Sequence, residues 1–433
     1  MPRRSLVLFA RVGACGGGTS TPPGPDGGIN ALLEAGPEAA ALPPQCEGAA
    51  VPPSRLECTG LYADLASKQL APGVEAYAPA VPLWSDGAEK HRWVLLPAGA
   101  TIDTSNPSEW VFPVGTKFWK QFSSGGRRIE TRLWQKVRSD RWVYATYAWN
   151  ADESAAPQSP GGDIPVADGT YHIPTSDECE KCHRGRTEHI LGFEEVELGL
   201  PGATGITLAD LVQRGLLSAP RATSLTIGDD GTGAAAPALG WLHANCGITC
   251  HNGNSNAIAY PSGLRFRLDA TQLDGRSSAG FDPLRTGVGV AVNAPNWKGQ
   301  VRIVPGDPDS SLLYYLISHR GPGMQMPPIA TRVVDEANVA LVRRWIAAMP
   351  AMPKPDAGPP DGGPDAEVDA APDATLPPDL APDLPVMPDA GVPDAAEPDA
   401  AVDAAEPDTA PDAGVDAEPD ASVDAESDAA TVD

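Results

Sequence analysis

The chain has 433 residues, of which 42% are hydrophobic, and a formal net charge of −26. Residues 354–433 hold 23 acidic residues and one Lys. The rest of the chain is therefore nearly neutral, so the low pI belongs to the tail, and we find no basic patch that would indicate nucleic-acid binding. The sequence has no run of the roughly 20 apolar residues that a helix needs to cross a bilayer, so we expect no transmembrane helix.

The N-terminal residues 1–15 resemble a bacterial lipoprotein signal. A basic start precedes an apolar run at 6–10, and small residues lead to Cys15, which such a signal would lipidate. The apolar run is shorter than the usual length of about 7–15 residues and Arg11 interrupts it, so an ordinary N-terminal tail or a start codon other than Met1 stays open. We expect an exported protein of the periplasm or cell envelope, anchored by lipid on Cys15.

Residues 16–45 are rich in Gly, Pro, Thr and Ala, which is typical of a flexible linker. Cys46 and Cys58 follow and bracket a short loop. In an oxidising compartment these two thiols would most simply form a disulfide, although sequence alone does not fix the pairing. At the other end of the chain, residues 351–433 are almost all Asp, Pro, Ala, Val, Glu and Gly. A segment with so little apolar surface predicts a disordered, extended tail.

The segment 46–175 predicts an antiparallel β-sandwich-like domain. Ile129 and Leu133 alternate with polar residues such as Arg132, and a second alternating run at 142–149 follows a short polar link, as in a hairpin. Seven of the ten Trp lie between positions 84 and 149. They indicate either the packed interior of this domain or a surface on which sugars or another flat ligand could stack.

Beyond this domain the pattern becomes helical, in a segment 176–235 and a mainly α domain 236–350. Thr207 and Asp210 have the spacing of a capping box, and Asp309 and Asp335 are placed to begin two further helices. The expected fold is therefore α+β and multidomain, with a β domain followed by helices.

Cys179-Glu-Lys-Cys182-His183 has the spacing of covalent haem attachment. Each thiol adds across one haem vinyl group, so the two sulfurs must lie on one face of a helical turn, and positions i and i+3 satisfy this. His183 then projects towards the iron as an axial ligand. A zinc site of Cys179, Cys182, His183 and His189 has suitable ligand types and is an alternative.

Cys246-Gly-Ile-Thr-Cys250-His251 has one more residue between its cysteines. Positions i and i+4 also share a helical face, and Gly247 could absorb an irregular turn. Downstream, Met326 precedes two prolines, which hold a loop extended and could present its thioether to the far side of a haem. We expect His251 and Met326 to be the two axial ligands of this iron.

Residues 239–349 resemble a divergent bacterial cytochrome c domain. The matching features are Asn245-Cys246 through His251-Asn252, Val304-Pro-Gly-Asp-Pro-Asp-Ser-Ser-Leu-Leu313, Met326-Pro-Pro and the helix ending Arg344-Trp345-Ile346. Upstream, the segments Pro82-Leu-Trp-Ser-Asp-Gly-Ala-Glu-Lys90, Arg127-Arg-Ile-Glu-Thr-Arg-Leu133 and Cys179 to His183 look like an exported family that joins a Trp-rich β domain to such modules. The resemblance implies haem binding and electron transfer, and it departs from the usual pattern in the longer second motif.

The sequence leaves open the ligand opposite His183, because no Met lies between Met1 and Met324. His189 is the nearest candidate, and the others are His172, His243 and His91. A vacant position is the alternative, and it would admit peroxide or another small ligand.

We therefore expect an electron-transfer protein with one or two haem c groups and an unidentified redox partner. Two other functions stay open. One is an exported glycan- or partner-binding protein in which Cys179–Cys182 and Cys246–Cys250 are structural disulfides. The other is a haem enzyme whose first iron has an open coordination site.

Overall fold

The computed structural model describes residues 43–166 and 169–351. The lipoprotein signal with Cys15, nearly all of the expected 16–45 linker and the acidic tail after residue 351 lie outside these residues.

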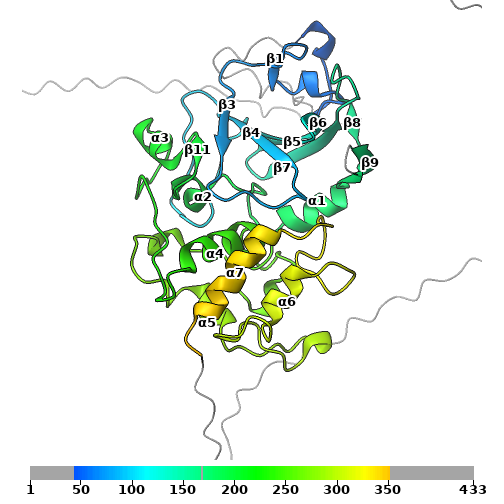
Figure 1. Cartoon of the computed structure of the whole chain (residues 1–433). Helices are drawn as coiled ribbons and strands as arrows, with labels where there is room; N and C mark the ends of the chain where they lie inside the picture. The colour runs from blue at the N-terminus through cyan, green and yellow to red at the C-terminus, as the bar shows by residue number, and fades with distance from the viewer. Residues whose placement is uncertain (1–42, 167–168, 352–433) are drawn as a thin grey trace, which may run out of the picture. The chain divides into compact units, whose positions relative to one another are not determined.

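An antiparallel seven-stranded sheet forms most of the N-terminal half of the described chain (Figure 1), in the order β11-β3-β4-β5-β6-β7-β8. The strands are β3 (Glu75–Ala78), β4 (Glu89–Leu95), β5 (Lys117–Ser124), β6 (Arg127–Arg138), β7 (Arg141–Ala148), β8 (Gln158–Ser159) and β11 (Thr204–Gly205). β6 and β7 form the hairpin that the alternating pattern predicts. Two smaller sheets pair β1 (Tyr62–Asp64) with β2 (Gln69–Leu70) and β9 (Gly162–Val166) with β10 (Gly169–Ile173).

The two faces of the large sheet are buried against different parts of the chain. Because side chains alternate along a strand, Phe118 and Trp134 join a cluster with the helices, whereas Trp119 and Leu133 join a cluster with the N-terminal segment. The sandwich-like expectation is therefore corrected to one sheet. Its second face is covered by helices and loops instead of a second large sheet.

The N-terminal segment covers the outer face of this sheet. It contains the short turns η2 (Pro44–Cys46) and η3 (Leu56–Cys58), which the expected Cys46–Cys58 disulfide joins with a Cα–Cα distance of 5.2 Å. Leu56 and Leu61 are fully buried beneath it. The disulfide therefore fastens the start of the described chain to the cover of the sheet.

The helical part begins with the helix that carries the first Cys-His motif. Its helices are α1 (Ser176–His183), α2 (Glu195–Gly199), α3 (Leu208–Gln213), α4 (Ala235–Leu242), α5 (Asp282–Gly287), α6 (Leu312–Ser318) and α7 (Glu336–Ala348). The π-helical turn η4 (His243–Gly247) continues α4, and the short turns η5 (Tyr260–Ser262), η6 (Ala270–Gln272) and η7 (Pro295–Trp297) lie in the loops. None of the helices within the described ranges is long and apolar enough to span a membrane.

Two of the three predicted caps are present. Thr207 and Asp210 form a capping box at α3, and the Asp335 side chain accepts the Asn338 amide at the start of α7. Asp309 does not cap α6, which begins after Ser311 without a side-chain cap. Asp309 instead pairs with Arg343 at 2.8 Å on the surface.

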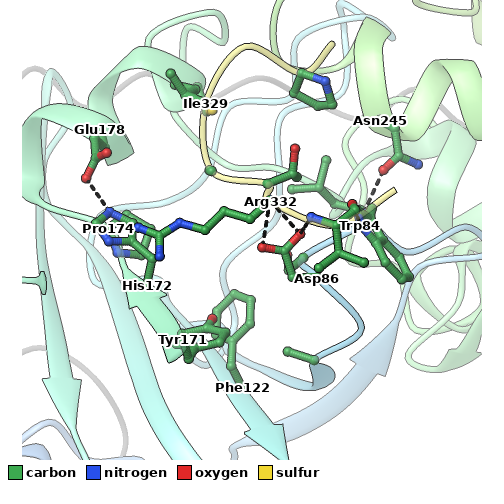
Figure 2. A pocket seen from close by; sticks show the side chains of 18 of the residues that line it. Trp84, Asp86, Phe122, Tyr171, His172, Pro174, Glu178, Asn245, Ile329 and Arg332 are labelled. Carbon is green, nitrogen blue, oxygen red and sulfur yellow. Dashed lines mark hydrogen bonds and ion pairs between the residues drawn. The ribbon is translucent and has the colours of Figure 1, made fainter. Parts of the chain in front are cut away.

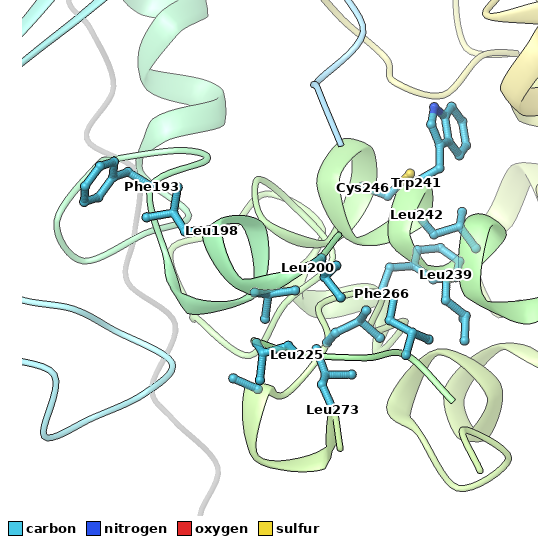
Figure 3. Close-up of a cluster of buried hydrophobic side chains, with 14 of the residues drawn as sticks. Phe193, Leu198, Leu200, Leu225, Leu239, Trp241, Leu242, Cys246, Phe266 and Leu273 are labelled. Atoms are coloured by element: carbon cyan, nitrogen blue, oxygen red, sulfur yellow. The ribbon is translucent and has the colours of Figure 1, made fainter. Parts of the chain in front are cut away.

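One hydrophobic cluster runs through the sheet and the helices, from Tyr77 on β3 to Met349 after α7. Figure 3 shows its central part, where Trp241 and Leu242 of α4 lie near Cys246. Cys246 therefore sits at the edge of the main core, and the packing of α4 fixes its position.

Replacing Asp335 with Ala should lower the free energy of unfolding by about 2 kcal/mol, because the change removes a helix cap and leaves the buried indole N–H of Trp241 without its acceptor at 3.0 Å. Asp309→Ala is the matched control and should change stability by less than about 0.5 kcal/mol, since it removes only an exposed ion pair. Urea unfolding of both variants measures the difference. Equal losses would contradict this assignment of the caps.

Candidate functional site

Both Cys-His motifs face one cavity of about 780 Å³ between the large sheet and the helical part. This volume is within the range of about 300–1,000 Å³ that is usual for small-molecule sites. The motif residues that line the cavity are Cys179, Cys182, His183, Cys246, Cys250 and His251, and Met326 lines it as well. The fold thus brings together three segments that are far apart in the sequence.

The first motif lies on α1, which begins at a capping box formed by Thr175 and Glu178. Cys179 and Cys182 are one helical turn apart and both face the cavity. The ring of His183 stacks on Trp134 with 4.4 Å between ring centroids, and its Nδ1 lies 2.5 Å from the carbonyl of His189. This contact favours the proton on Nδ1 and leaves Nε2 with its lone pair free, the tautomer that is usual among metal-bound histidines.

The second motif begins inside the π-helical turn η4. Two backbone bonds there span five residues, from Ile248 N to the His243 carbonyl at 2.9 Å and from His251 N to the Cys246 carbonyl at 2.8 Å. A π-turn accommodates one extra residue in a helix, and such turns are frequent at functional sites. The extra residue of this motif is therefore taken up by a local widening of the helix.

Two glycines let the motifs approach their surroundings closely. A Cβ on Gly247 would lie 2.5 Å from the Arg267 amide nitrogen, so only Gly fits the turn. A Cβ on Gly185, just after the first motif, would collide with the Thr249 carbonyl inside the second motif. Asn252 also donates to the Gly185 carbonyl at 3.3 Å. The ends of the two motifs are therefore in direct contact.

The Pro82–Lys90 segment joins the second motif to the loop that carries Met326 (Figure 2). The Trp84 amide donates to Asn245 at 2.6 Å, and its indole donates to the Val333 carbonyl at 2.9 Å. The Asp86 carboxylate accepts the amides of Arg332 and Val333 at 2.9 and 3.0 Å. These bonds hold the Met326 loop against the cavity.

The four motif cysteines are free in the structure, so neither of the two alternative disulfides is present. Burial raises the pKa of Cys182 and of Cys246 to about 12, and the neighbouring Cys250 adds to both shifts. At neutral pH these side chains are thiols. That state differs from the stabilised thiolate of a thioredoxin-like or catalytic cysteine.

The two motif histidines are neutral at physiological pH. Burial lowers the pKa of His183 to about 3 and that of His251 to about 4. The Leu264 carbonyl opposes the shift at His251, although His251 Nδ1 makes no hydrogen bond of normal geometry with the described residues. A neutral imidazole is the form that binds a metal.

The other histidines that the sequence offered as distal ligands have other contacts or lie outside the cavity lining. His172 lines the cavity, but its two ring nitrogens face Asp163 at 2.6 Å and Glu178 at 3.0 Å. His243 is buried between Glu194 and the Leu268 amide. His189 and His91 do not line the cavity. Their rings stack on Trp134 and Trp93, respectively.

Several cavity residues were not singled out from the sequence. Lys120, Phe122 and Arg132 lie on the face of β5 and β6 that looks towards the helices, and they line the cavity. Glu130 on the same face is fully buried and binds Arg132 at 2.5 Å. The alternation showed that these residues share a face. It did not distinguish a polar face in solvent from one that lines a cavity.

The Trp residues between positions 84 and 149 serve packing. None of the seven is exposed; the buried ones are Trp110, Trp119, Trp134 and Trp149, and the half-buried ones are Trp84, Trp93 and Trp142. A flat stacking surface for sugars would need exposed rings. This arrangement therefore favours the packing interpretation.

A buried polar cluster surrounds Glu194 behind the motifs. The Glu194 carboxylate contacts Arg186 at 3.0 Å, Arg267 at 2.7 Å and His243 at 3.0 Å. Burial alone would raise the pKa of Glu194, but the two guanidinium groups hold it well below its usual value. The nearby Glu197 lacks such partners, and burial raises its pKa to about 8.

No family model, curated protein or solved structure matches this chain. In the part of the chain that the structure describes, no three His, Cys, Asp or Glu side chains form a group that could hold a metal ion by themselves.

Glu197→Gln should remove a pH dependence of stability. The folded pKa of Glu197 is raised to about 8, so its contribution is present below the unfolded pKa and is lost as pH rises towards 8. Between pH 5 and pH 8 the wild type should therefore lose about 3 kcal/mol relative to the variant. Urea unfolding of both proteins at the two pH values measures this change. The prediction is contradicted if the free energies of unfolding of the wild type and the variant differ by the same amount at pH 5 and at pH 8.

Asp86→Ala should loosen the Met326 loop, because the amides of Arg332 and Val333 lose their shared acceptor. Their hydrogen exchange should become about tenfold faster or more, the effect of losing a charge-assisted hydrogen bond. Asp86 has a positive φ of 51°, a backbone conformation that Asn also tolerates. Asp86→Asn keeps one acceptor oxygen, so its amide exchange rates should lie between those of the wild type and of Asp86→Ala. Asp274→Ala is the surface control. If it also accelerated exchange at the Arg332 and Val333 amides, the role of Asp86 in holding the Met326 loop would be refuted.

Proposed function

We propose that this protein is an exported c-type cytochrome-like protein that transfers electrons. It would hold haem c through Cys179 and Cys182 with His183 and through Cys246 and Cys250 with His251. In this proposal the helical part is a divergent cytochrome c-like domain. The observation that carries the proposal is the convergence of both motifs and Met326 on one cavity.

The residues present fit such a group. The cysteines are buried or half-buried thiols with raised pKa values, the form that adds to a vinyl group, and the histidines are neutral. The contact of His183 Nδ1 with the His189 carbonyl directs Nε2 away from the backbone. The aromatic rings of Phe122 and Tyr171 and the apolar residues of the 326–333 loop supply further wall. An apolar wall with a few convergent polar groups is typical of cofactor sites.

When bound, the haem supplies an iron that changes between Fe(II) and Fe(III). The chain contributes orientation and exclusion of water. Trp134 supports the ring of His183 from behind at 4.4 Å, which restricts its rotation. Asp86 and Trp84 hold the Met326 loop in place, so that the Met326 thioether can serve the side of the iron opposite His251. Because the motifs touch at Gly185 and Thr249, electrons could pass between two adjacent groups and out to a redox partner protein.

The other two functions have less support. A glycan-binding protein with structural disulfides is not favoured, because the seven Trp are not exposed and the motif cysteines are free. A haem enzyme remains the second candidate, favoured by the absence of a free histidine opposite His183 among the described residues that line the cavity. Export and lipid attachment at Cys15 remain parts of the proposal that rest on the sequence.

The haem count tests the proposal. The protein is matured in a bacterial periplasm with haem-attachment machinery, and the intact mass is measured under denaturing conditions. We expect the mass of two haems in the wild type and of one haem in the Cys179→Ala/Cys182→Ala and Cys246→Ala/Cys250→Ala variants. Cys46→Ser/Cys58→Ser, which removes only the structural disulfide, should keep both. A matured wild type without covalent haem would refute the function.

A further inference from the structure

The sheet wall of the cavity carries a row of basic side chains. Arg92, Lys120 and Arg132 are cross-strand partners on β4, β5 and β6, so they lie side by side on the same face. Lys120 and Arg132 line the cavity with the cysteines of the first motif. Both lie close enough to Cys179 and Cys182 for their charges to lower the pKa of those thiols, although burial outweighs this effect.

Among the basic side chains that line the cavity, Lys120 differs in having no partner in the described residues. Arg132 forms a bidentate pair with Glu130 at 2.5 and 2.8 Å, and Arg332 binds Asp163 at 3.1 Å. Lys120 Nζ makes no hydrogen bond or ion pair with any residue that the structure describes, and its nearest aromatic contact is the ring of Phe122 at 5.1 Å. A half-buried amine without a partner on the cavity wall is available to a ligand that enters the cavity.

The chemistry of this amine suits a metal. Burial and the charges of Arg92, Lys90 and Arg132 hold the pKa of Lys120 well below its usual value, and Glu130 opposes them only weakly. A neutral amine has a free lone pair and can act as a nitrogen ligand in the same way as an imidazole. Burial and the neighbouring positive charges favour the neutral amine over the ammonium form.

No other nitrogen ligand is free opposite His183 in the described part of the cavity. Both nitrogens of His172 face carboxylates, and His243, His189 and His91 do not line the cavity. Met326 is carried by the loop that is tied to the second motif through Trp84 and Asn245. Lys120 is therefore the nitrogen base without a partner among the described residues that line the cavity with the first motif.

We propose that the Lys120 amine is the second axial ligand of the iron held by Cys179, Cys182 and His183. The assignment rests on the proposed function and extends it by naming the coordination of the first haem. It gives the two irons different ligand sets, His and Lys at the first and His and Met at the second. Both coordination spheres are then complete, which suits electron transfer and leaves no position for a substrate.

The test uses the full-length, haem-loaded protein and carbon monoxide as the probe. The reduced wild type should bind no carbon monoxide. Lys120→Leu, which keeps the bulk without the nitrogen, should bind one carbon monoxide per chain, and the ferric spectrum should change from wholly low-spin to half high-spin. Lys120→Arg, which keeps the charge but offers no lone pair, should behave in the same way and serves if the Leu variant does not fold. Lys90→Leu, at a neighbouring basic position outside the cavity lining, should leave the spectrum unchanged.

Two results would overturn the assignment. Binding of one carbon monoxide per chain by the wild type would mean that the position opposite His183 is vacant, as a haem enzyme requires. Wholly low-spin spectra in both Lys120 variants would mean that another residue is the ligand. Either result leaves the haem count at two, so failure of the Lys120 assignment is distinguishable from failure of haem binding, and the first result favours the haem enzyme over the electron-transfer protein. A haem count of zero in the wild type would be found before any Lys120 variant is made. It would refute the proposed function and the Lys120 assignment together.

Discussion

The geometry of the cavity depends on the buried carboxylate of Glu194. It binds Arg186 from the segment after the first motif, His243 from the turn before the second and Arg267 from the segment after it. A buried carboxylate is tolerated only with such partners, and removal of one partner leaves an uncompensated charge. Side chains from three segments next to the motifs therefore contact the same carboxylate. These contacts fix the relative positions of the segments in addition to apolar packing.

The large sheet provides the opposite wall. At one end of its inner face Val94, Phe118 and Trp134 pack against the helices, while further along the same strands Lys120 and Arg132 turn the face polar. The inner face therefore changes from apolar packing against the helices to a cavity lining that includes basic side chains.

Local sequence patterns predicted several elements, but they could not predict contacts between residues far apart in the sequence. The β6–β7 hairpin, the caps at Thr207 and Asp335 and the Cys46–Cys58 disulfide follow from spacing within short segments. Asp309 is not a cap, because α6 begins only after Ser311, and its carboxylate pairs with the distant Arg343. The convergence of the two motifs and the role of Lys120 depend on strand register and on contacts between remote segments. No periodicity in one sequence encodes them.

The ties between Asp86 and the Met326 loop join residues 246 positions apart in the sequence. A chain that enters an oxidising compartment N-terminus first exposes the sheet wall and the first motif well before the segment that closes over them has arrived. In the proposed cytochrome, this order would give the attachment machinery a period of free access, which ends when the last segment docks. The long sequence separation of these contacts would then delay closure of the cavity during maturation. Closure before attachment would leave the chain without haem.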